Sequence, residues 1–103
     1  ILEEYTMRAY AGYGIDYSAF WNYYRNTSKV DYSQYAQLFK NCMVNSIDSL
    51  GIYYGSAYVN NVGDNLTKVL KRAKVSMASN GMPDKAIKHI SEKFKKWLYE
   101  YYA

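Results

Sequence analysis

The sequence predicts an all-α protein, and three features support this expectation. Pro83 is its only proline. Apolar residues recur at steps of three and four, whereas the alternation typical of strands never lasts more than a few residues. Residues that cap helices stand before several of these apolar segments. We therefore expect a four-helix bundle with short extra N-terminal helical segments, formed by residues 1–103 as a single domain.

The first two helical segments are short. Residues 1–11 can form a helix that ends near Gly12. Asp16 is placed to cap a second helix over residues 17–25, which is rich in aromatic side chains. The polar residues 26–28 end it.

A longer helix follows. Asp31, with Gln34 three residues later, predicts a capping box at its start. The residues of its expected buried face are Tyr35, Ala36, Phe39, Cys42, Met43, Ser46, Ile47 and Leu50. Gly51 either ends this helix or marks a close helix crossing. We expect helix to continue to about Val59, and residues 60–63 predict a loop.

The two C-terminal helices have the clearest boundaries. Asp64 is predicted to cap the first of them, whose core stripe is Leu66, Val69, Leu70, Ala73 and Met77. Asn80 and Gly81 are typical of a helix C-terminus, and Pro83 is expected at the first position of the last helix. That helix gathers Ile87, Ile90, Phe94, Trp97, Leu98 and Tyr101 on one side.

The composition argues against catalysis. The chain has one cysteine and one histidine, too few for a zinc site or a disulfide framework. Cys42 falls in an apolar stripe and is expected to be buried, while His89 is expected to be solvated on the polar side of the last helix. No phosphate-binding loop, dinucleotide fingerprint or calcium loop is present. We expect no enzyme, cofactor, metal, small-molecule substrate or membrane span.

The surplus of positive charge is confined to the second half of the chain. Residues 1–60 contain four Lys and Arg against five Asp and Glu, a net charge of −1. Residues 61–103 contain nine against four, a net charge of +5. This asymmetry indicates an acidic partner, and nucleic acid is the first candidate.

The cations lie on the polar faces of the last two helices. They are Lys68, Lys71, Arg72 and Lys74 on one helix and Lys85, Lys88, Lys93, Lys95 and Lys96 on the other. Val75 is an apolar residue among them. Two solvated helix faces would also carry lysines, but the scarcity of acids favours a surface that binds a polyanion. Lysine outnumbers arginine eight to one here, which favours contacts with phosphates over contacts with base edges.

Fourteen tyrosines are more than one small core can bury. Tyrosine is rigid, amphipathic and common at protein interfaces. We expect those of the N-terminal half to contact other subunits, with plain packing as the alternative. The set predicted for a subunit interface is Tyr13, Tyr17, Tyr23, Tyr24, Tyr53 and Tyr54.

The layout resembles the major coat proteins of filamentous archaeal viruses. The likeness lies in residues 51–58 (GIYYGSAY) and in the helix pair formed by residues 66–79 and 83–102. It is nearest to the lipothrixvirus type, as in Acidianus filamentous virus, with rudivirus coat proteins as more distant relatives. The resemblance implies a helical bundle behind a flexible N-terminal extension, which we expect to be absent from this chain.

The same resemblance implies a function. Coat subunits of this kind assemble, with themselves or a partner subunit, around linear double-stranded DNA into a helical filament, so the protein would be located in a virion assembled in the host cytoplasm. The residues that would contact DNA phosphates are Lys68, Lys71, Arg72, Lys85, Lys88, Lys95 and Lys96.

Two alternatives remain open. One is a helical protein-interaction module, of the inhibitor type, that docks an acidic protein surface with its lysine face. The other is a DNA-binding regulator resembling a helix-turn-helix protein, built from residues 66–79 and 83–102. The second helix of that pair offers lysines but no Arg, Asn or Gln for base contacts, which disfavours this regulator.

Overall fold

The computed structural model describes residues 16–50 and 56–102, and side chains within residues 16–50, 67–98 and 100. This part of the chain is all-helical and contains no strand, as predicted. Its elements are α2 (Tyr17–Thr27), a 3-10 turn (Ser33–Tyr35), α3 (Ala36–Leu50), α4 (Ser56–Ser79) and α5 (Asp84–Tyr102). The helix expected over residues 1–11 lies outside the described residues.

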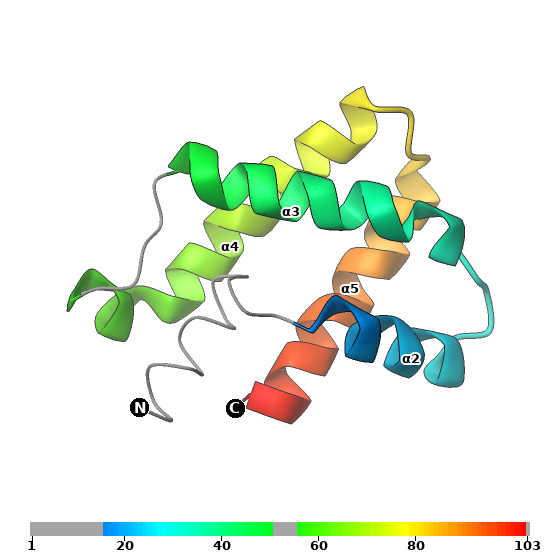
Figure 1. Ribbon diagram of the computed structural model, residues 1–103, viewed down its shortest axis with the longest axis horizontal. Coiled ribbons are helices and arrows are strands. Elements are labelled where there is room, and N and C mark those ends of the chain that lie inside the picture. Colours follow the sequence, from blue (N-terminus) through cyan, green and yellow to red (C-terminus); the bar gives the residue numbers. More distant parts are fainter. Residues whose placement is uncertain (1–15, 51–55, 103) are drawn as a thin grey trace.

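The helices pack in successive pairs. Helix α3 packs along α4, α4 contacts α5, and α2 lies against α5 (Figure 1). The two halves of the chain therefore meet in two places, where α3 packs on α4 and where α2 packs on α5. In this arrangement one side of α4, next to α3, faces solvent, and so does one side of α5.

Helix α2 begins where the sequence predicts. The Asp16 carboxylate accepts a hydrogen bond from the backbone N–H of Ala19 at 3.0 Å, which satisfies one of the free amides of the first turn. The helix ends at Thr27, two residues beyond the expected range, where the Thr27 hydroxyl donates to the carbonyl of Tyr23.

Helix α3 begins later than the predicted capping box implies. Asp31 Oδ1 accepts from the N–H of Ser33 at 2.8 Å, and not from Gln34. The chain then forms a 3-10 turn and enters the α-helix at Ala36. An aspartate side chain often accepts from the backbone N–H two residues later and forms a turn instead of capping a helix. Asp31 forms such a turn here.

The loop predicted at residues 60–63 is wrong. Helix α4 runs without interruption over 24 residues from Ser56, and Asp64 lies inside it instead of capping it. One internal glycine costs a helix only about 1 kcal/mol relative to alanine. That cost is small beside the packing of the apolar stripe of α4, so Gly63 and its asparagine neighbours do not end the helix.

The turn between α4 and α5 follows the predicted signals closely. Gly81 has a φ of 90°, the N–H of Met82 bonds to the carbonyl of Met77 at 3.0 Å, and that of Gly81 bonds to Ala78 at 3.1 Å. This is a Schellman motif, and both methionines are buried in the core. Pro83 immediately precedes α5, and its carbonyl accepts from Ile87.

An aromatic cluster forms the centre of the core. The ring centroid of Phe20 lies 4.9 Å from that of Trp21, 5.1 Å from Phe94, 5.6 Å from Trp97 and 5.7 Å from Phe39. These rings come from α2, α3 and α5, and each fully buried aromatic or aliphatic side chain contributes about 1.5–3 kcal/mol. The cluster therefore sets which face of α5 is turned to solvent.

Candidate functional site

The side of α4 turned away from the core carries three of the predicted cations. Lys68, Lys71 and Arg72 are exposed, while Val69 and Ala73 of the same turns are buried. The stripe of apolar residues at steps of three and four orients the helix in this way. The sequence prediction that these three cations face solvent is confirmed.

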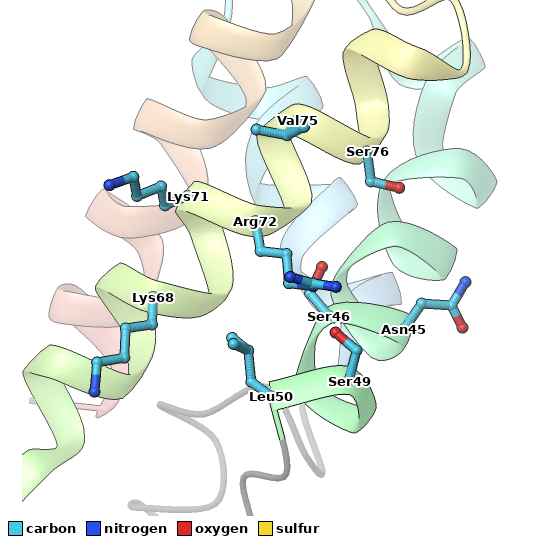
Figure 2. Close-up of a pocket in the computed structure, with 9 residues that line it drawn as sticks. All are labelled: Asn45, Ser46, Ser49, Leu50, Lys68, Lys71, Arg72, Val75 and Ser76. Atoms are coloured by element: carbon cyan, nitrogen blue, oxygen red, sulfur yellow. The ribbon is translucent and has the colours of Figure 1, made fainter.

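These three cations line a groove between α3 and α4 with a volume of about 620 Å³. Its residues are Asn45, Ser46, Ser49 and Leu50 of α3, and Lys68, Lys71, Arg72, Val75 and Ser76 of α4. In Figure 2 the side chain of Arg72 extends toward Ser46, while the ammonium groups of Lys68 and Lys71 point away from α3. The Ser46 hydroxyl donates to the carbonyl of Cys42 at 2.6 Å and keeps lone pairs free to accept.

The α3 side of this groove differs from the sequence prediction at Leu50. Ser46 is buried, as predicted, and also lines the groove, whereas Leu50, which is expected on the same buried face, is 37 % exposed. Asn45 and Ser49, which flank Ser46, were not considered as site residues. The polar residues Asn45, Ser46 and Ser49 could be recognised in the sequence as a polar end of α3. Only the packing of α3 on α4 shows that this end faces Arg72.

The other four predicted cations lie on α5. Lys85, Lys88, Lys95 and Lys96 are all exposed, opposite a buried face that includes Ile90 and Phe94. We call them the α5 lysine stripe, because at 100° per residue they fall within an arc of about 100°. Glu92 is also exposed and lies within this arc. The structure thus separates the seven cations into a groove set and a stripe set, on different helices.

Lys93 differs from the lysines of the stripe. Its ammonium donates to the carbonyl of Thr27 at 2.8 Å and lies 6.0 Å from the ring centroid of Tyr23. It therefore fastens the end of α2 to α5. Lys93 therefore stabilises the packing of α2 on α5, whereas the lysines of the stripe face solvent.

The tyrosines predicted for a subunit interface divide into three groups. Tyr24 is 0 % exposed and belongs to the core, so it presents no surface to a partner. Tyr17 and Tyr23 are half-buried against that core. Tyr13, Tyr53 and Tyr54 lie outside the described residues.

Burial raises the pKa of the Tyr17 hydroxyl above the range of an exposed tyrosine. The ring lies edge-on to Phe39 at 6.2 Å and stacks on Phe94 at 6.3 Å. Its hydroxyl oxygen is buried and has no hydrogen-bond partner within the described part of the chain. Tyr17 therefore stays neutral and acts as a packing residue.

His89 is not the solvated residue that the sequence predicts. It is half-buried, and its Nδ1 lies 2.9 Å from the hydroxyl oxygen of Tyr24. The imidazole packs edge-on against Tyr24 and Tyr32. Cys42 is buried, as predicted.

The described residues offer neither a metal site nor a membrane span. They contain no group of three or more histidine, cysteine, aspartate or glutamate side chains that could hold a metal ion. None of the helices in residues 16–50 and 56–102 is long and apolar enough to cross a membrane.

Comparison with family models, with curated proteins and with solved structures found no match for this chain. The groove between α3 and α4 and the α5 lysine stripe are therefore the two features of the described chain that bear on its function.

Proposed function

We propose that this chain is a virion coat protein that binds double-stranded DNA along its phosphate backbone and assembles with other coat subunits into a helical filament. In this proposal the four-helix domain is a binding bundle and not an enzyme. The observation that carries the DNA-binding part is the α5 lysine stripe, in which four exposed lysines share one side of one helix. The coat-protein part rests on the resemblance of the sequence to filamentous archaeal virus coat proteins.

The dimensions of the stripe suit a duplex. Its lysines span residues 85–96, which corresponds to about 16 Å along a helix. Double-stranded DNA carries one negative charge for about every 1.7 Å of its axis, so several phosphates lie within reach of the stripe. Lysine presents a compact charge without the fixed fork of arginine, and such contacts position DNA without selecting a sequence.

The test is fluorescence anisotropy with two unrelated duplexes over a series of salt concentrations. We expect equal affinities and a steep salt dependence. The triple variant Lys88→Gln, Lys95→Gln and Lys96→Gln should lower the slope of log K against log salt by about 2.7, at roughly 0.9 for each lost phosphate contact. Electron microscopy of the mixture of protein and DNA would then show whether filaments form.

A matched control removes the same charge elsewhere. Arg25, Lys29 and Lys40 are exposed on α2, on the following loop and on α3. Changing all three to Gln should leave the slope close to that of the wild type. Equal losses in the two triple variants would show that only net charge matters and would reject the stripe. A strong preference for one duplex would favour the regulator instead.

The cations of α4 are not included in this DNA surface. Lys68, Lys71 and Arg72 were expected to contact phosphates as well. They line a groove that also exposes apolar side chains, and this difference from the α5 lysine stripe supports a separate role.

A further inference from the structure

The groove between α3 and α4 combines positive charge with exposed apolar surface. Four large hydrophobic side chains are exposed among the described residues, namely Val30, Val44, Leu50 and Val75. Two of them, Leu50 and Val75, line this groove from opposite helices. Val75 is 65 % exposed and lies one turn from both Lys71 and Arg72, so apolar surface and positive charge are adjacent on this face of α4.

The charge of the groove has one sign. Lys68, Lys71 and Arg72 are among its nine lining residues, and none of the nine is acidic. The Ser46 hydroxyl is committed to the carbonyl of Cys42, but the hydroxyls of Ser49 and Ser76 and the amide of Asn45 can donate hydrogen bonds to an anion. An anionic ligand is therefore complementary to this groove.

Phosphate alone does not account for the apolar part. A DNA backbone would pair with the cations but would offer little apolar surface to Val75 and Leu50. An occupant that also buries these two side chains gains about 25 cal/mol for each Å² of apolar surface removed from water. The α5 lysine stripe contains no large exposed hydrophobic residue in the described chain, so the two surfaces suit different partners.

We propose that this groove binds an acidic, amphipathic helical segment of a partner protein. Apolar side chains of that segment pack on Val75 and Leu50, and its carboxylates pair with Lys68, Lys71 and Arg72. Arg72, which extends toward α3, is suited to a bidentate contact with one carboxylate (Figure 2). The α4 residues that line the groove span positions 68–76, about 12 Å, so roughly two turns of a bound helix would contact them.

This inference does not depend on DNA binding by α5. It goes beyond the proposed function because it assigns the groove to a protein partner. The partner is defined by chemistry: apolar residues spaced three or four apart, flanked by Asp or Glu.

The experiment uses a library of random peptides of about 16 residues, displayed on phage and selected against the full chain. The length is chosen because shorter isolated helices are marginal in water. Enriched peptides are synthesised, and their affinity is measured for the wild type and three double variants. Leu50→Ser with Val75→Ser removes the apolar surface, and Lys68→Glu with Arg72→Glu reverses the charge. Val30→Ser with Val44→Ser removes exposed apolar surface outside the groove.

We expect enriched peptides to carry acidic residues beside apolar ones at helical spacing. Their affinity should fall about tenfold or more in each groove variant, a loss of about 1.4 kcal/mol, and stay unchanged in the Val30 and Val44 variant. Circular dichroism should show that all variants keep their helix content, because the replaced side chains are exposed.

Several outcomes would overturn the proposal. One is that no peptide binds the wild type more tightly than it binds the Lys68→Glu, Arg72→Glu variant. A second is that the enriched peptides carry no acidic residues. Another is loss of DNA binding in the Leu50 and Val75 variant, which would assign the groove to DNA. Self-association of the wild type that the same variant abolishes would assign it to a second copy of this chain.

The two proposals can fail separately. The triple Lys88, Lys95 and Lys96 variant should bind the peptides as the wild type does while losing DNA affinity. The Leu50 and Val75 variant should show the reverse pattern.

Discussion

The hydroxyl of Tyr24 joins two separate parts of the fold. Its oxygen lies 2.9 Å from Nδ1 of His89 on α5 and accepts a hydrogen bond from the backbone N–H of Tyr32 at 3.1 Å. A hydroxyl has one proton and two lone pairs, so Tyr24 can accept from the Tyr32 N–H and hydrogen-bond to His89 at the same time, and the imidazole tautomer sets the direction of the second bond. Burial is the main cause that raises the pKa of Tyr24, so the hydroxyl keeps its proton.

This relationship predicts that Tyr24→Phe destabilises the protein by about 1–3 kcal/mol, the cost of leaving hydrogen-bonding groups without a partner in a largely buried site. Chemical denaturation measures the free energy of unfolding. Tyr32→Phe is the control, because it keeps the ring and the backbone N–H that donates to Tyr24. A loss in Tyr32→Phe as large as that in Tyr24→Phe would contradict a special role for the Tyr24 hydroxyl.

The buried hydroxyl of Tyr17 predicts a loss of stability in alkali. Its pKa is higher in the folded chain than in the unfolded chain, so the stabilisation is complete below about pH 10, the ordinary tyrosine value. Above that pH the unfolded chain binds fewer protons than the folded one, and the free energy of unfolding decreases.

Tyr17→Phe should make this alkaline decrease shallower without abolishing it, because Tyr24 acts in the same direction. Urea denaturation at about pH 8 and about pH 10.5 provides the comparison. An unchanged pH dependence in Tyr17→Phe would show that Tyr17 ionises as easily in the folded chain as in the unfolded one.

Gly81 predicts a graded series of variants. A Cβ added there would meet no atom within 4 Å, so backbone strain at a φ of 90° is the main cost. We expect Gly81→Ala to lose about 1–2 kcal/mol and Gly81→Asn to lose less, since asparagine tolerates positive φ better. Equal thermal stability of the two variants would argue that strain does not decide this position.

The cap at the start of α2 predicts a smaller effect. Asp16→Ala removes the acceptor for the N–H of Ala19 and should cost about 1 kcal/mol. Asp16→Asn, which can still accept, should restore most of the loss. The neighbouring exposed residue Ser18 provides a control through Ser18→Ala, and thermal melts of the three variants suffice for the comparison.

Local signals in the sequence determined much of the fold. The apolar stripes of α4 and α5 correctly placed Val69, Ala73, Ile90 and Phe94 in the core, because a helix repeats every 3.6 residues. The Schellman turn at Gly81 was also predictable, since few other residues adopt its backbone conformation. The predicted break at residues 60–63 failed because tertiary packing outweighs the weak local preference of glycine and asparagine.

The tertiary structure alone decided how these helices combine. Lysines on α4 and α5 could be recognised in the sequence, but only the packing of α3 on α4 gives Arg72 its groove and leaves the α5 lysine stripe separate. Likewise, His89 has a polar position on its own helix and is half-buried only because Tyr24 and Tyr32 pack against it. Periodicity fixes which side of one helix is apolar, whereas contacts between residues distant in the chain depend on how the whole core is packed.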